Sequence, residues 1–114
     1  MPAKKNPLKL NALQLKTLCL FQALTEDENH AGGETEQGGR EILFMPQPHG
    51  DHFHVADGVV LSRDATGLAN PAVWKALGKK GLIAARPGGG VIVTAEGMGY
   101  DTGVQKQILH GSDH

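Results

Sequence analysis

The segment from Asn70 to Ala95 constrains the fold more than any other part of the chain. It reads NPAVWKALGKKGLIAARPGGGVIVTA. Asn70 can cap a helix, because its side chain accepts a hydrogen bond from a backbone N–H that would otherwise be unpaired. Pro71 suits the first helical position, and Gly81 suits the left-handed residue that ends a helix. A helix over residues 70–80 is too short to persist alone, so it must pack against the rest of the chain.

Two apolar runs follow this helix and indicate a β-hairpin. Residues 82–86 and 91–95 both have strand composition. The four residues between them, Pro-Gly-Gly-Gly, have the backbone freedom that a tight turn needs. The segment therefore predicts a short helix followed by a two-stranded flap.

Three pieces of this segment form a recognisable pattern: ALGKKGLI at residues 76–83, the glycine-rich hairpin, and TAEG at residues 94–97. In this pattern the chain resembles winged helix-turn-helix transcription regulators, most closely the MarR-like proteins, over roughly residues 68–97. The resemblance implies an α+β fold with a recognition helix at 70–80 that enters the major groove of duplex DNA. It also implies a wing at 86–91 that reaches the phosphates or the minor groove, and a role in transcription regulation.

Basic residues in this segment are the candidate DNA-binding residues. Lys75 and Lys79 lie on the side of the expected helix opposite Val73 and Leu77, so they would meet base edges or phosphates. The full set of candidates is Lys75, Lys79, Lys80, Arg86, Arg63 and the backbone of Gly89. The alternative is an ordinary solvated helix face, since lysine is a surface residue by default.

Residues 11–24 form the other well-marked helix, which a capping box from Asn11 to Gln14 opens. This helix is apolar nearly all round, which predicts burial on more than one side. Two arrangements would provide that burial. Either a C-terminal segment containing Ile108 and Leu109 covers the helix, or a second copy of the chain does, and we expect a homodimer through this surface.

The rest of the chain is expected to be strands and irregular segments. Strands are indicated at residues 41–45, 52–56 and 59–61, the last two forming an additional β-hairpin before the recognition helix. The glycines after residue 97 argue against regular structure there, apart from a helical turn or two within 104–109. The remaining expectations are a loose N-terminal arm at 1–7, a flexible acidic Gly-rich loop at 26–40, a short helix or turn at 62–67 and a loosely structured C-terminus at 104–114.

Length and charge set further limits. A chain of 114 residues predicts one domain with a single modest core, and its lone Cys19 excludes an internal disulfide, which is typical of a cytoplasmic protein. No run of residues is apolar enough to suggest a membrane span. The net charge of −1 is unusual for a DNA-binding domain, but the charge is segregated. Residues 62–94 carry five basic residues and one acid, whereas residues 25–41 carry six acids and one arginine.

A histidine cluster is the most metal-like feature of the sequence. It consists of His49, Asp51, His52 and His54. On a strand, His52 and His54 point to the same face and could chelate zinc with a third ligand from the cluster. We favour the alternative that the intervening Phe53 and Val55 face the core and the histidines face water, because the spacing matches no standard zinc pattern. No cofactor is therefore expected, and the other histidines, including His30, are expected to be isolated surface residues.

Catalytic groups are not evident. Cys19 lies within an apolar helix, where a thiol is usually inert, and no serine has the context of a nucleophile. We expect no enzyme activity. The alternatives to DNA binding are a protein–protein interaction module, whose contact surface would be the apolar first helix and Trp74, and a metal-responsive sensor that uses the histidine cluster.

Overall fold

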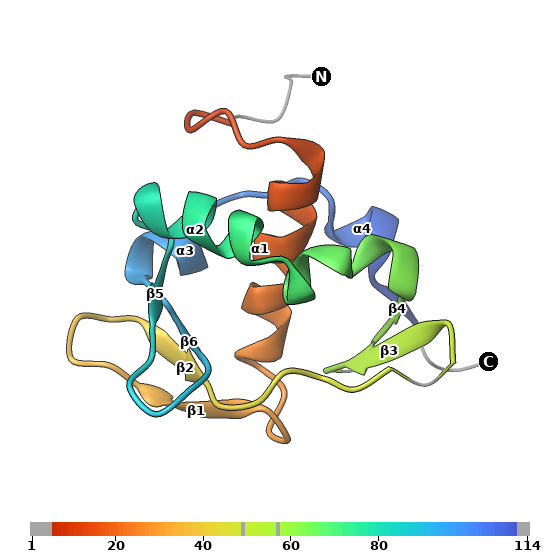
Figure 1. Cartoon of the computed structure of the whole chain (residues 1–114), viewed down its shortest axis with the longest axis horizontal. Coiled ribbons are helices and arrows are strands. Elements are labelled where there is room, and N and C mark those ends of the chain that lie inside the picture. The colour runs from red at the N-terminus through yellow and green to blue at the C-terminus, as the bar shows by residue number, and fades with distance from the viewer. Residues whose placement is uncertain (1–5, 49, 57, 112–114) are drawn as a thin grey trace.

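The structure is a computed structural model that describes residues 6–48, 50–56 and 58–111. Its described part is a small α+β domain with four α-helices and two antiparallel sheets. Helix α1 (Ala12–Leu24) runs through the centre, with one sheet on either side of its C-terminal half (Figure 1). None of the described helices is long and apolar enough to cross a bilayer.

Helix α1 confirms the expected capping box. The Gln14 amide N–H donates to Asn11 Oδ1 at 2.8 Å, and the Asn11 N–H donates to Gln14 Oε1 at 3.0 Å. The side chains of Leu18 and Phe21, with those of Leu20 and Leu24, are fully buried. Helices α2, α3 and α4 and strand β3 all contact α1, so its apolar surface is covered within one chain. The cover from the C-terminal segment, one of the two arrangements that the sequence offered, is present as α4, and a homodimer stays a prediction.

The first sheet has the strand order β1-β2-β6-β5, and all its neighbours are antiparallel. Its strands are β1 (Ala31–Glu34), β2 (Arg40–Ile42), β5 (Ile83–Ala85) and β6 (Val91–Val93). Ile42 pairs with Val91, and both are fully buried on the face that packs toward the helices. The expected hairpin is thus confirmed as β5–β6, with strands shorter than the sequence indicated.

Strand β1 corrects the expectation of an unstructured loop at residues 26–40. Its sequence, AGGE, offers no apolar alternation, yet its backbone pairs with β2 between Ala31 and Ile42 and between Glu34 and Arg40. Backbone pairing needs no particular side chain, and for this reason the period of the sequence gave no sign of it. The strand expected at 41–45 also begins one residue earlier and ends at Ile42.

The second sheet has the order β3-β4-β7 and contains the additional hairpin that the sequence predicted. Its strands are β3 (His52–Val55), β4 (Gly58–Leu61) and β7 (His110–Gly111). The described part of the C-terminus is more regular than expected, because α4 (Gln105–Ile108) inserts Ile108 into the core with 1% of its surface exposed. Helix α3 (Ala95–Gly99) was also not expected, and Thr94 caps it by accepting a bond from the Gly97 N–H.

Residues 1–5 of the expected N-terminal arm lie outside the described residues. Asn6 is held by hydrogen bonds of its side chain. Its Nδ2 donates to the Leu10 carbonyl at 2.8 Å, its Oδ1 accepts from the Leu10 N–H at 3.0 Å, and the Tyr100 hydroxyl donates to the same oxygen. Leu10 is itself buried, so the chain is already part of the folded domain before α1 begins.

Helix α2 (Pro71–Lys79) follows two short 3-10 helices, η1 (Ser62–Asp64) and η2 (Thr66–Ala69), in the region where a short helix or turn was expected. Asn70 Oδ1 accepts from the Ala72 N–H at 3.0 Å, Pro71 occupies the first turn, and Gly81 has a φ of +78°, as the sequence predicted for the cap, the start and the end. The inward side chains Val73 and Leu77 are buried.

Gly67 lets η2 approach α1 closely. A Cβ atom built on Gly67 would lie 1.8 Å from Thr17 Oγ1, and Thr17 is fully buried. The Thr17 hydroxyl is fixed because it donates to the Leu13 carbonyl at 2.8 Å. No larger residue fits at position 67 without separating the two elements.

We expect Gly67→Ala to lower the free energy of unfolding by about 1–3 kcal/mol, because it overpacks a contact that cannot relax outward. Urea denaturation followed by circular dichroism measures the change. Gly33→Ala is the matched control, since its added Cβ would meet nothing within 4 Å. Thr17→Ala should restore part of the loss in the double variant; the absence of any rescue would contradict the proposed clash.

Candidate nucleic-acid interface

Three lysines project from α2 and its C-terminal end. Lys75, Lys79 and Lys80, here called the lysine cluster, are all exposed. The burial of Val73 and Leu77 forces Lys75 and Lys79 onto the outward side, one helical turn apart. None of the three lysines forms an ion pair with an acid among the described residues.

Some of these lysines could also stabilise the helix that carries them. Cations near the C-terminus of a helix interact favourably with its macrodipole, which is worth roughly 0.3–1 kcal/mol each at an exposed site. Lys79 and Lys80 occupy such positions. Lys75 lies in the middle of the helix, so the macrodipole does not explain why a lysine stands at this position.

The β5–β6 hairpin turns through glycine residues that adopt left-handed backbone conformations. Gly88, Gly89 and Gly90 have φ values of +89°, +113° and +87°. A Cβ on Gly90 would lie 2.1 Å from the Ile42 carbonyl oxygen, so this glycine is required where the turn meets β2. Gly89 is exposed with open space around it. The tip therefore presents backbone rather than side chains to solvent.

Arg86 does not project into solvent as the sequence led us to expect. Its Nη1 donates to the Gly89 carbonyl at 3.0 Å and to the Pro87 carbonyl at 3.4 Å. Its Nε lies 3.4 Å from Glu41 Oε2, close enough for an ion pair but without the alignment of a hydrogen bond. Arg86 thus braces the hairpin against β2, so a phosphate contact by this side chain would compete with bonds inside the hairpin.

The structure does not bring all six predicted DNA-binding residues together. The lysine cluster lies on and just after α2, whereas the hairpin tip with Gly89 is separated from it by the length of β5 (Figure 1). Arg63 is exposed in η1, on the far side of α1 from the C-terminal end of α2 (Figure 1). Its neighbour Asp64 pairs with Lys16 at 2.9 Å. Only the lysine cluster forms one continuous site.

Trp74 is placed as a core residue. Its indole Nε1–H donates to the Leu68 carbonyl at 3.2 Å, and its ring meets that of Phe21 edge to face with the centroids 5.3 Å apart. These contacts fix the ring between η2 and α1. Trp74 is therefore not an exposed surface for a partner protein or a base.

The described members of the histidine cluster, Asp51, His52 and His54, lie on β3 or directly before it. Val55 is buried and Phe53 partly buried, while the rings of His52 and His54 meet edge to face with centroids 4.9 Å apart. Asp51 Oδ1 lies 3.4 Å from His52 Nδ1. Within the described residues no three or more histidine, cysteine or acidic side chains are arranged to hold a metal ion, and His49 lies outside those residues.

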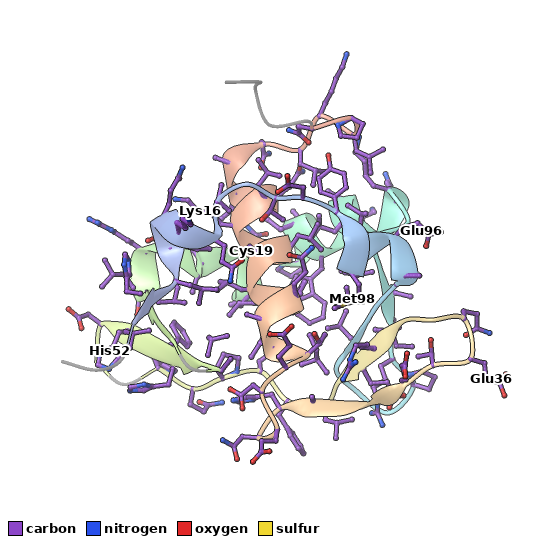
Figure 2. The ribbon with its side chains drawn as sticks, turned by 180° about the vertical axis from the view of Figure 1, so that it is seen from behind. Lys16, Cys19, Glu36, His52, Glu96 and Met98 are labelled. Carbon is purple, nitrogen blue, oxygen red and sulfur yellow. The ribbon has the colours of Figure 1, made fainter. Side chains whose placement is uncertain are left out.

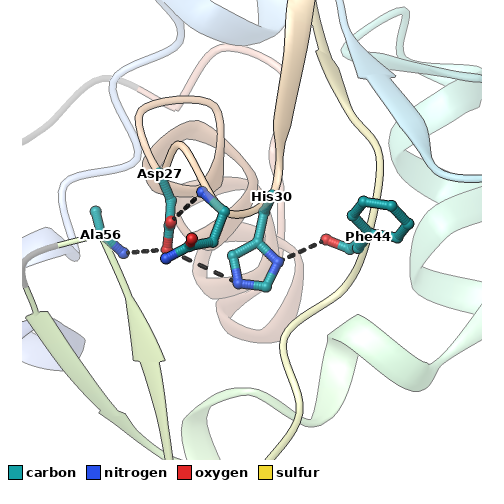
Figure 3. Close-up of polar contacts among 5 residues, drawn as sticks. Asp27, His30, Phe44 and Ala56 are labelled. Carbon is teal, nitrogen blue, oxygen red and sulfur yellow. Dashed lines mark hydrogen bonds and ion pairs between the residues drawn. The ribbon is translucent and has the colours of Figure 1, made fainter.

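One polar network was not foreseen, and it involves His30, which we had expected to be an isolated surface residue. Asp27 is buried, and its carboxylate accepts from the Asn29 N–H at 2.9 Å and from the Ala56 N–H at 2.8 Å (Figure 3). His30 Nε2 lies 3.8 Å from the same carboxylate, and its Nδ1 lies 3.0 Å from the Phe44 carbonyl, so Nδ1 carries the proton of that bond. The network joins the two sheets at the base of α1.

Ala56 explains why this network is needed. It has a φ of +53°, a conformation that costs a non-glycine residue roughly 1 kcal/mol or more. The bond from its N–H to Asp27 holds the β3–β4 turn in this conformation. No motif in the sequence marks such a contact, because Asp27 and Ala56 are 29 residues apart.

Cys19 lies at the centre of the molecule on α1 (Figure 2). It lines a groove of about 460 Å³. The groove runs between α1, the β3–β4 hairpin and the C-terminal segment. Burial raises the pKa of the Cys19 thiol, and a hydrogen bond with Thr102 opposes this only in part. The thiol is therefore protonated near neutral pH and is not an activated nucleophile.

Comparison of the chain with protein families, curated proteins and solved structures finds no match. Only the side chains described above therefore indicate a function. Among them, the lysine cluster is the largest group of exposed like charges on one short element.

We expect Asp27→Asn to lower the free energy of unfolding by about 1–3 kcal/mol, because the amide replaces one acceptor oxygen with a donor facing backbone N–H groups. Urea denaturation measures the loss. Glu28→Gln is the control, since it removes the same charge from an exposed neighbour. Equal stability of the two variants would show that the Asp27 network does not hold the sheets together.

We expect the Cys19 thiol to react with iodoacetamide at pH 8 at least about tenfold more slowly in the folded protein than in urea, because burial both raises its pKa and blocks access. The rate should increase with pH as the thiolate forms. Mass spectrometry of timed samples gives both rates. Similar rates in the two states would mean that the thiol is accessible.

Proposed function

We propose that this protein binds double-stranded DNA through the lysine cluster of α2, as a small winged-helix-like domain. The observation that carries the proposal is the exposure of Lys75, Lys79 and Lys80 on one short helix without an acidic partner among the described residues. Lysine ammonium groups attract phosphates, and the release of counterions from the duplex drives such binding.

The order of the elements supports a winged-helix-like arrangement. After α1 come β1 and β2, the β3–β4 hairpin, η1 and η2, then α2 and the β5–β6 hairpin, with β2 paired to β6. In that arrangement α2 takes the place of the recognition helix and the β5–β6 hairpin that of the wing. Other small α+β folds have a compatible order of elements, so the proposal of DNA binding rests on the lysine cluster and not on the topology.

The distribution of charge makes binding possible despite the net charge of −1. The potential at a contact depends on nearby charges, because salt screens charges more than about 8–10 Å away. Three of the six acids of residues 25–41 belong to the β1–β2 region and the other three to the segment between α1 and β1. Glu36, between β1 and β2, projects at the edge of the molecule (Figure 2). Glu41 among them is already paired with Arg86.

The alternative of a protein–protein interaction module has little exposed surface in the regions expected to make the contact. Most of the apolar face of α1 is buried, and Trp74 is fixed against Phe21 and Leu68. A homodimer through α1 would have to use partly exposed residues such as Leu13 and Leu15. For the metal-sensor alternative, the described residues offer two neighbouring histidines and one adjacent acid as possible ligands.

We expect the double variant Lys75→Glu, Lys79→Glu to abolish binding to a random 20-base-pair duplex at 50 mM KCl, because it turns two attractive charges into repulsive ones. The wild-type protein should show a log–log salt slope of about −3, from roughly three phosphate contacts. Fluorescence anisotropy gives both quantities, and circular dichroism should show unchanged helix content.

The matched control is the double variant Arg40→Glu, Lys106→Glu, which makes the same change in net charge at exposed positions away from α2. It should retain binding with a reduced affinity from long-range charge alone. Undiminished binding by the Lys75 and Lys79 variant would place the site elsewhere, and no binding by the wild-type protein would refute the proposal.

A further inference from the structure

The exposed side of α2 holds none of the side chains that read base edges with a planar pair of hydrogen-bonding groups. Bases in the major groove are distinguished mainly by hydrogen bonds from arginine or lysine to guanine and from asparagine or glutamine to adenine. Between Pro71 and Lys79 the helix contains lysine but no arginine, asparagine or glutamine, and the lysine ammonium lacks the planar fork with which arginine fits guanine. Its exposed members are a proline, an alanine, a glycine and the two lysines.

The two flanking residues with the required chemistry are committed to the chain itself. Asn70 uses its Oδ1 to cap α2, so it cannot offer the oxygen and the amide together to adenine. In Arg86, Nη1 donates to the carbonyls of Pro87 and Gly89, and Nε lies beside the carboxylate of Glu41. Neither residue can form a paired contact with a base without giving up a contact that holds α2 or the hairpin.

The hairpin tip also lacks base-reading groups. Pro87, Gly88 and Gly89 are exposed and offer backbone atoms and the apolar proline ring, but no polar side-chain atom. Backbone atoms can meet phosphates or the walls of a groove, but they do not distinguish one base pair from another. The groups left for DNA are the lysine ammoniums, which are compact, strongly hydrated point charges without the planar fork of arginine.

Stacking on single-stranded bases is not offered on this side of the molecule either. Trp74 is fixed by Phe21 and Leu68. Phe44, with 63% of its surface exposed, is the one strongly exposed large apolar side chain among the described residues, and it follows β2 rather than α2. Proteins that bind single strands combine a basic groove with aromatic platforms, and the lysine cluster has no such platform beside it.

We infer that the protein binds duplex DNA without sequence preference, through its phosphates. This inference rests on the proposed function and specifies its substrate class. Each well-placed paired contact to a base discriminates by about five- to 150-fold, so a surface with no such contact should discriminate very little. Binding should instead depend on duplex length and on salt.

The test measures the affinity of the wild-type protein for duplexes of one length and different sequence. Dissociation constants for A·T-rich, G·C-rich and mixed 20-base-pair duplexes should agree within about threefold at 50 mM KCl, with equal salt slopes. Repeated selection from a randomised duplex pool should enrich no motif. A motif bound more than about tenfold more tightly than the pool would overturn the inference while leaving DNA binding itself intact.

Two further measurements sharpen the result. Arg86→Gln should leave the salt slope unchanged, because Arg86 is engaged within the hairpin; a slope reduced by about one would mean that Arg86 contacts a phosphate and would contradict its assigned role. A 20-nucleotide single strand should bind more weakly than the duplex, and tighter binding would overturn the choice of duplex. If no duplex binds at all, the proposed function fails together with the inference.

Discussion

The burial of helix α1 is the constraint on which the rest of the structure depends. Four of its side chains, Leu18, Leu20, Phe21 and Leu24, have no exposed surface, so other elements must surround the helix. Helices α2, α3 and α4, the 3-10 helix η2 and strand β3 provide this cover. Each of these elements is too short to be stable alone, since the longest, α2, has nine residues. Their packing on α1 supplies the stability that they lack, with close approaches such as that of Gly67 to Thr17 setting the fit.

This packing also determines which charges are available. Because Val73 and Leu77 are drawn inward toward α1, Lys75 and Lys79 are turned outward, and no described acid forms an ion pair with them. Arg86, in contrast, is engaged within the chain, although its position beside a glycine-rich turn led us to expect a phosphate ligand. The turn leaves the carbonyls of Pro87 and Gly89 in need of a donor, and Arg86 supplies it. One arginine is thus used for folding, while the lysines on the neighbouring helix are not.

Elements with local signals could be predicted from the sequence, and elements that depend on distant partners could not. The Asn11 and Asn70 caps, the end of α2 at Gly81 and the two hairpins were all recognisable because a turn or cap requires particular residues at fixed spacing. Strand β7 was not, since it is defined by backbone bonds to β4, far away in sequence. Strand β1 was not either, since its sequence AGGE has no apolar alternation. The same limit applies to the site. Sequence alone identified the basic residues, but only coordinates show that Arg86 is paired with Glu41 and that Arg63 lies apart from α2.

The most direct test of DNA binding by the lysine cluster is an NMR titration of the ¹⁵N-labelled protein with a random 20-base-pair duplex at low salt. Amide signals of residues 72–81 should shift progressively, with smaller changes in the β5–β6 hairpin. Those of the β3-β4-β7 sheet, which lies on the other side of α1, should remain in place. Shifts confined to the β3-β4-β7 sheet or to the β1–β2 region, with the signals of α2 unchanged, would contradict the assignment of the lysine cluster as the DNA-binding surface.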